Sequence, residues 1–136
     1  MSNILKNIEE KWQKNWKERK EFECKVNKKQ KFFVTFPYPY INGLLHLGHA
    51  LTSSRAEFIS RYKRLRGYNT LFPQAFHLTG SPIVAAAYRL KQKDEKIKRD
   101  LLMQKVSEKE IEKFVNPKNW VDYFLPKARE AFEKLG

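Results

Sequence analysis

The sequence is short of the features that place a small protein in several common classes. Its single cysteine, Cys24, cannot form an internal disulfide, and we expect a reducing compartment, the cytoplasm. No apolar run approaches the roughly 20 residues that a membrane-spanning helix needs, which excludes an integral membrane protein. The first residues also lack the apolar core of a signal peptide. Neither a Walker A run nor a GxGxxG pattern occurs, so two common nucleotide-binding signatures are missing.

Acidic residues are scarce in the middle of the chain. The 136 residues carry 28 Lys and Arg against 15 Asp and Glu, for a net charge of +13. Residues 32–90 hold 6 of these basic side chains and only 1 acidic one, Glu57. Such unopposed charge suits nucleic acid or a phosphate-bearing ligand, and solubility alone is the alternative. A hydrophobic fraction of 41% and an aromatic fraction of 14% are enough for the core of one small domain.

The first third of the chain predicts a helix and then a strand. Residues 3–19 place an apolar stripe on one helix face, and we expect the stripe to dock onto the domain; it consists of Ile4, Ile8, Trp12 and Trp16. Residues 31–36 are aromatic and β-branched, which predicts a strand. Because their apolarity is continuous, we expect burial on both faces, as in a parallel sheet.

A long helix over residues 46–66 follows, ended by Gly67. Its apolar residues share a broad face that we expect to point inward: Leu51, Phe58, Ile59, Tyr62 and Leu65. Its basic residues are expected on the outer side: Arg55, Arg61, Lys63, Arg64 and Arg66. A second strand over residues 69–72 would complete a parallel strand–helix–strand unit, so the fold class is α/β.

The last third predicts helices from their caps. A helix opens at about residue 83 and fades into a charged run, residues 91–100. Ser107 and Glu110 form a capping box, and Asn116 followed by Pro117 marks another helix start. Pro126 can open a further helix in the same way.

The segment between the first strand and the long helix carries the chemistry. It reads Phe-Pro-Tyr-Pro-Tyr-Ile-Asn-Gly-Leu-Leu-His-Leu-Gly-His over residues 36–49. His46 and His49 lie at i and i+3, on one face of a first helical turn whose free N–H groups attract phosphate. Gly48 between them lets a base or ribose approach the backbone. A zinc site is disfavoured, because two histidines rarely suffice and His77 and Cys24 are the only further His and Cys.

The run His46-Leu47-Gly48-His49, preceded by Pro-Tyr and Asn-Gly, resembles the first signature of class I aminoacyl-tRNA synthetases. Residues 61–73 and 76–83 resemble the following segments of leucyl enzymes of the archaeal and eukaryotic type, and residues 114–136 resemble what precedes their editing insertion. The resemblance implies the N-terminal part of such an enzyme. It implies a helical arm over residues 1–30 and the first half of a Rossmann-like catalytic domain over residues 31–136.

The resemblance also implies roles for individual residues. His46 and His49 would be catalytic, contacting the ATP phosphates and the charge that develops at the α-phosphate. The implied ATP contacts are His46, Gly48, His49, Asn42 and Gly43, although Asn42 stands where a small residue such as Ser often occurs. The implied amino-acid site consists of Tyr38, Pro39, Tyr40 and His77. His77 stands where bacterial leucyl enzymes resemble one another in having an Asp near the substrate amino group.

The implied reaction forms leucyl-adenylate from leucine and ATP, with Mg²⁺ carried on the ATP and no tightly bound metal, for transfer to tRNA(Leu). The second family signature, Lys-Met-Ser-Lys-Ser, is absent, so a second chain supplying the rest of the catalytic domain is a further expected partner. Three alternatives stay open. They are a non-catalytic basic tRNA-binding module, a structural subunit, and a class I synthetase for valine, isoleucine or methionine.

Overall fold

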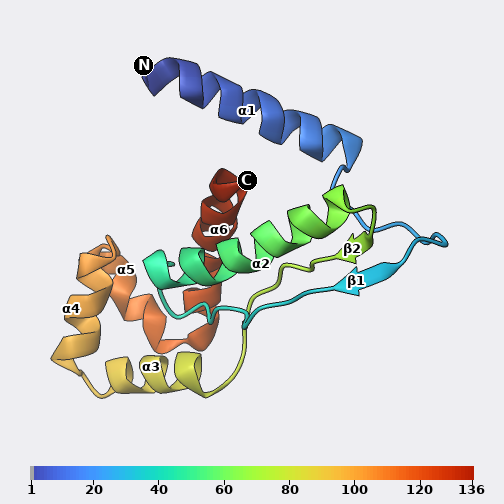
Figure 1. The fold of residues 1–136 in the computed structure, drawn as a ribbon. Coiled ribbons are helices and arrows are strands. Elements are labelled where there is room, and N and C mark those ends of the chain that lie inside the picture. The colour runs from blue at the N-terminus through green and yellow to red at the C-terminus, as the bar shows by residue number, and fades with distance from the viewer. Residues whose placement is uncertain (1) are drawn as a thin grey trace.

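The computed structural model describes residues 2–136, so residue 1 of the expected arm lies outside the described part. Its elements are α1 (Ser2–Arg19), β1 (Lys31–Phe33), α2 (Leu47–Leu65), β2 (Asn69–Leu71), α3 (Ser81–Lys91), α4 (Glu95–Met103), α5 (Glu108–Ile111), the 3₁₀ helix η1 (Glu112–Val115) and α6 (Pro117–Leu135). Figure 1 shows three regions: α1 by itself, the β1–α2–β2 unit in the middle, and α3 to α6 gathered beyond it. The α/β class is confirmed. No helix within residues 2–136 is both long and apolar enough to cross a membrane.

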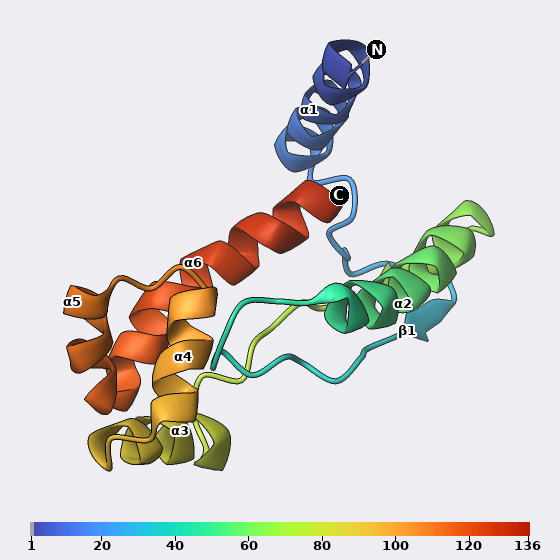
Figure 2. The same ribbon diagram turned by 90° about the vertical axis from the view of Figure 1, so that its left-hand side faces the viewer.

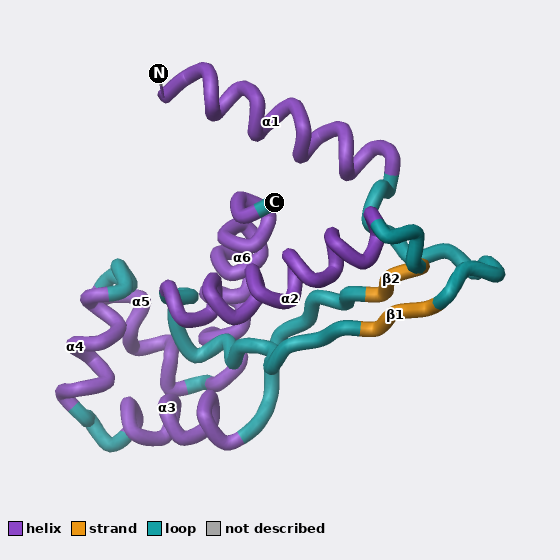
Figure 3. The backbone as a smooth tube through the Cα atoms, in the orientation of Figure 1, coloured by secondary structure: helices purple, strands orange, loops and turns teal. Residues whose placement is uncertain are grey.

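The two strands pair in parallel, as the strand–helix–strand pattern predicts, with Phe32 opposite Thr70. β1 is shorter than expected and ends before Pro37 and Pro39, which have no N–H to donate to a ladder. The two chain segments nevertheless continue side by side (Figure 3). His77 donates its backbone N–H to Pro39 at 2.9 Å, and Ile41 donates to the His77 carbonyl at 3.1 Å.

The expectation of burial on both faces of the first strand is wrong. Phe33 is 61% exposed, because α2 covers one face of a sheet that has only two strands. The inward face of α2 is also different from the prediction: it is made of Ser53, Ala56 and Ser60. The serine hydroxyls donate to carbonyls of their own helix, so these small residues let α2 lie close to the strands without an unmade hydrogen bond.

The apolar face that was expected to point inward from α2 is therefore exposed. Its members range from 47% to 87% exposed: Leu51, Phe58, Ile59, Tyr62 and Leu65. The prediction that the basic residues of α2 lie on its outer side is only partly right. Arg55 and Arg66 are exposed, but Arg61 and Arg64 are partly buried against the Phe22 ring.

α1 is a helix as predicted, but only Trp16 of its apolar stripe is partly buried, so the expected docking of the whole stripe is wrong. Ile4, Ile8 and Trp12 are 66%, 47% and 48% exposed, and α1 stands off from the rest of the chain in both ribbon views (Figures 1 and 2). Contact is confined to its C-terminal half, where the Arg61 guanidinium lies 4.7 Å from the Trp16 ring centroid. Lys20, with a φ of +51°, follows Arg19 and ends the helix.

The main hydrophobic core belongs to α3 to α6. Its buried residues are Ile41, Ile83, Ala86, Ala87, Leu90, Leu101, Val106, Ile111, Phe114, Trp120, Phe124 and Ala128. Only Ile41 comes from outside the segment 83–128, so the cluster closes largely on itself. Trp120 satisfies its indole N–H by donating to the Phe114 carbonyl at 2.7 Å.

The caps of this cluster agree with the sequence at two places and disagree at two. The Ser107 capping box and the Asn116 cap are both present. The charged run was not expected to be helical, yet Asp94 caps α4 there by accepting from the Lys96 N–H at 2.9 Å. Pro126 opens no new helix but lies inside α6, where it is exposed and the carbonyl it leaves unpaired can be solvated.

Candidate functional site

The two histidines form the start of α2. His46 is the N-cap, with extended backbone angles of −120° and 172°, and His49 is the third residue of the helix. The Gly48 N–H donates to His46 Nδ1 at 3.1 Å, and the His46 N–H donates to His49 Nδ1 at 3.2 Å. This reciprocal capping brings the two ring centroids to 3.9 Å. A pattern usually made with Ser and Glu is built here from imidazoles.

This capping decides which nitrogen of each ring carries the proton. Each Nδ1 accepts a backbone hydrogen bond, which is the arrangement of the imidazole tautomer that holds its proton on Nε2. Neither Nε2 has a protein partner among residues 2–136. The helix start therefore presents two unused N–H donors beside the positive end of the helix dipole, an arrangement suited to phosphate oxygens.

The electrostatics of the pair favour the neutral form of His49. Burial lowers the pKa of the His49 imidazole, and the neighbouring His46 lowers it further. A phosphate bound at the helix start would oppose both effects, because an anion stabilises the imidazolium. The pKa of His49 therefore responds to what occupies this end of α2.

Two glycines of the motif are in close contact with other side chains of the chain, which leave no room for a Cβ. A Cβ on Gly48 would lie 2.9 Å from His46 Cε1, so glycine is what lets His46 fold back over the first turn. A Cβ on Gly43 would lie 2.7 Å from Gln104 Oε1. That oxygen accepts the Leu44 N–H at 2.6 Å and ties the turn before His46 to the end of α4.

Gln104 is the site residue that sequence reasoning missed. It lies 60 positions from its partner. It is the C-cap of a helix that the sequence did not predict, so no local pattern marks it. Its amide nitrogen donates to the Asp100 carbonyl at 3.2 Å, which fixes the side chain for the contact with Leu44. Asn42 is exposed in the same turn.

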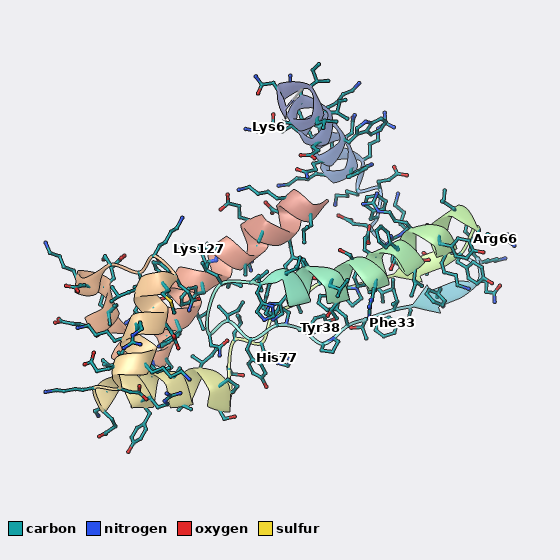
Figure 4. The ribbon with its side chains drawn as sticks, turned by 60° about the vertical axis from the view of Figure 1, so that its left-hand side comes forward. Lys6, Phe33, Tyr38, Arg66, His77 and Lys127 are labelled. Carbon is teal, nitrogen blue, oxygen red and sulfur yellow. The ribbon has the colours of Figure 1, made fainter. Side chains whose placement is uncertain are left out.

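The residues implied for the amino-acid site form a second group, where the segment after β2 passes beside the motif (Figure 4). The rings of Tyr40 and His77 stack at 4.7 Å with an interplanar angle of 24°. Tyr38 lies 6.4 Å from the same imidazole, centroid to centroid, and its hydroxyl donates to the Pro73 carbonyl at 3.4 Å. Pro39 is buried and accepts the His77 N–H.

The structure thus brings the predicted residues together as two groups rather than one. The histidine pair and the Tyr40–His77 stack lie at the two ends of residues 40–49, and no hydrogen bond or ring contact joins them within the described chain. Ile41 lies between them in the sequence and is fully buried in the helical core, which fixes this segment of the backbone. Across residues 2–136, no cluster of three His, Cys, Asp or Glu side chains is arranged to hold a metal.

Comparison with known proteins gives a consistent set of similarities. The model of the family described as tRNA synthetases class I (I, L, M and V) matches residues 10–136. The leucine--tRNA ligase of Aeropyrum pernix is 45% identical over 133 residues, and that of Pyrococcus horikoshii is 47% identical over 138 residues. Each match covers 97% of this chain and 14% of the relative, so the chain spans about one seventh of these proteins.

A solved structure is similar as well. It is described as the ternary complex of an Agrobacterium radiobacter LeuRS with tRNA and LeuAMS. The match has a TM-score of 0.57 and 29% sequence identity, and it covers 71% of this chain and 13% of that one. Sequence and structure therefore point to the same kind of protein.

Proposed function

The chain belongs to the class I tRNA synthetases of the isoleucine, leucine, methionine and valine group, and from that premise we propose that it supplies the ATP- and leucine-binding part of a leucyl-tRNA synthetase. The observation that carries the proposal is the imidazole capping of α2, which leaves two Nε2–H donors at a helix N-terminus. Leucine is preferred over valine, isoleucine or methionine because the similar proteins named above are leucine--tRNA ligases.

The proposed chemistry is an in-line displacement at the α-phosphorus of ATP. A carboxylate oxygen of leucine attacks that phosphorus, the bond to the bridging oxygen of the β-phosphate breaks, and pyrophosphate leaves. His46 and His49 donate their Nε2–H groups to the phosphate oxygens on which charge develops, and they neither gain nor lose a proton. Catalysis of this type rests on positioning and on electrostatic stabilisation, and Mg²⁺ arrives bound to the ATP phosphates.

Leucine is proposed to bind at the second group. The Tyr40–His77 stack forms one wall beside Pro39, and Tyr38 supports it through its contact with the same imidazole. Gly43 and Asn42 would then lie between the two substrates, in the turn that Gln104 holds. Gly48 would face the adenine or ribose.

We propose the same division of the chain that the sequence suggests: an arm over residues 1–30 and the first half of the catalytic domain over residues 31–136. The exposed apolar face of α2 needs cover. The rest of the domain, on a second chain or a continuation of this one, would supply it. The product would be passed to tRNA(Leu) during translation in the cytoplasm.

The test uses the three histidines of the chain, whose imidazole proton resonances report the two groups separately. ATP with Mg²⁺ should shift the His46 and His49 signals, and leucine should shift the His77 signal. Leucine-dependent ATP–pyrophosphate exchange should then exceed that of a His46→Ala, His49→Ala double variant. Gln92→Ala, at an exposed position in the helical cluster, is the matched control and should behave as the unchanged chain.

ATP that leaves the His46 and His49 signals in place would contradict the proposal. Retained tRNA binding in that case would favour a non-catalytic basic module, which needs neither histidine. A response to neither ligand until another polypeptide is added would favour the structural subunit.

A further inference from the structure

A polar groove lies at the opposite end of α2 from the histidine pair. Its volume is about 610 Å³, and the linker after α1, the last turns of α2 and the start of β2 form its walls. Six cationic side chains line it: Arg19, Lys20, Lys25, Lys29, Arg61 and Arg64. Only two carboxylates do so, Glu21 and Glu23.

The carboxylates do not neutralise this charge. Glu23 pairs with Lys20 at 3.6 Å, and Arg61 pairs with Glu57 of its own helix. The other cations, Arg19, Lys25, Lys29 and Arg64, have no carboxylate within 4 Å in the described part of the chain. The groove therefore keeps several positive charges for a ligand.

Two polar atoms in its wall are buried with no hydrogen-bond partner. They are Arg64 Nη1 and Thr70 Oγ1, and the described residues hold no other such side-chain atoms. Thr70 is only 3% exposed, and both residues line this groove. Both atoms are closed to solvent, and Arg64 uses its other terminal nitrogen, Nη2, to donate to the Phe22 carbonyl at 3.4 Å. The partly buried guanidinium therefore adds a fixed positive charge to the wall of the groove.

The neighbouring aromatic rings are already occupied by cations. Arg61 and Arg64 lie 4.7 and 5.1 Å from the Phe22 ring centroid, and Lys63 lies 4.7 Å from that of Tyr68. These stacks hold the cations in place, but they leave the Phe22 and Tyr68 rings little face on which a base could stack. Recognition here is of charge and oxygen acceptors, independent of base sequence.

We propose that this groove binds the phosphate backbone of RNA. Several unpaired cations on both the linker and α2 exceed what one phosphate needs, which favours a chain of phosphates over a single anion. The inference rests on the proposed function only in taking RNA as the polyanion. The histidine pair plays no part in it.

The test measures binding of a fluorescently labelled RNA hairpin of about 20 nucleotides over a series of salt concentrations. The triple variant Lys25→Ala, Lys29→Ala, Arg64→Gln should bind about 10- to 100-fold more weakly, and the slope of log K against log salt should fall by about three. The matched control Lys109→Ala, Lys113→Ala, Lys118→Ala removes the same charge from the helical cluster. It should lose less than about threefold.

A further variant separates binding from folding. Lys25→Ala, Lys29→Ala changes only exposed side chains and should keep most of the loss. Its melting temperature should equal that of the unchanged chain, so that its loss of RNA binding does not reflect unfolding.

Equal losses in the two triple variants would overturn the proposal in favour of diffuse charge. Displacement of RNA by inorganic phosphate at constant ionic strength, with no dependence on RNA length, would overturn it in favour of a single-phosphate site. The groove triple variant should retain the ATP-induced shifts of His46 and His49. Failure of this inference is thereby distinguished from failure of the proposed function.

Discussion

The helical cluster α3 to α6 and the β1–α2–β2 unit differ in which side chains they bury. The cluster packs large residues such as Phe124 and Trp120 against one another and leaves them 0% and 2% exposed. The β1–α2–β2 unit buries small or polar residues such as Ser60 and Thr70 and leaves Phe58 and Leu65 at 72% and 87% exposure. Since burial of apolar area is the main source of stability, the cluster is the stable body of the chain.

The consequence concerns the candidate site. The histidine pair is on the less stable unit, and the Tyr40–His77 stack lies on segments that join the two regions. Ile41 and Gln104 are the points at which the cluster holds the motif. The cluster thus acts as the scaffold of the site although it contributes no proposed ligand contact.

The strongest effect is expected from a mutation in the core of the helical cluster. Phe124→Ala should lower the free energy of unfolding by about 3–5 kcal/mol, because it removes a fully buried ring from a packed core. Phe58→Ala on α2 removes the same side chain from an exposed face and should change it by less than about 0.5 kcal/mol. Urea unfolding of both variants measures the difference. Similar losses would mean that the α2 face is covered in solution.

An intermediate effect is expected where the two regions are joined. Gln104→Ala removes the acceptor of the Leu44 N–H and should cost about 1 kcal/mol. Hydrogen exchange at the Leu44 amide should accelerate, while the amides of α6 keep their protection. Gln92→Ala is the control for loss of an exposed glutamine. Unchanged exchange at Leu44 would show that Gln104 does not hold the turn.

The weakest effect is expected on the pH dependence of stability, through His49 on the β1–α2–β2 unit. Burial and His46 lower the pKa of His49 in the folded chain, so the folded chain binds fewer protons than the unfolded chain. The contribution of His49 to the free energy of unfolding is therefore full above the unfolded pKa of about 6.5. It decreases as the pH falls toward the lowered pKa of the folded chain. His49→Asn keeps an acceptor for the His46 N–H and should flatten this part of the pH profile. An imidazole titration of His49 at or above that of a free histidine would contradict the expectation.

Most signals that act within a few residues were read correctly from the sequence, although the cap at Asp94 and the place of Pro126 inside α6 were not. The cap at Asn116, the box at Ser107 and the stop at Gly67, which has a φ of +88°, each depend on neighbours in the chain. The start of α2 at His46 belongs to the same group. The parallel pairing of β1 and β2 joins residues far apart in the sequence and was predicted from the order of strand, helix and strand.

Most features that depend on distant partners were not predicted from the sequence. The apolar stripe of α2 indicates which residues share a face, but Ser53 and Ser60 show that closeness to the strands decided which face turned inward. Likewise, the stripe of α1 cannot show that Ile4, Ile8 and Trp12 stay exposed. Gln104 enters the site only because α4 ends beside Leu44. The family resemblance named the residues of the candidate site, but it did not name the residues of the helical cluster that hold them in place.

The three tryptophans give each part of the chain its own optical signal. Trp120 is 2% exposed in the cluster, Trp12 is 48% exposed on α1, and Trp16 lies under the Arg61 guanidinium. Chains that retain one tryptophan at a time would emit at different wavelengths, because indole emission follows the polarity around the ring. A spectrometer could then follow melting of the cluster and release of the arm as separate events in one molecule.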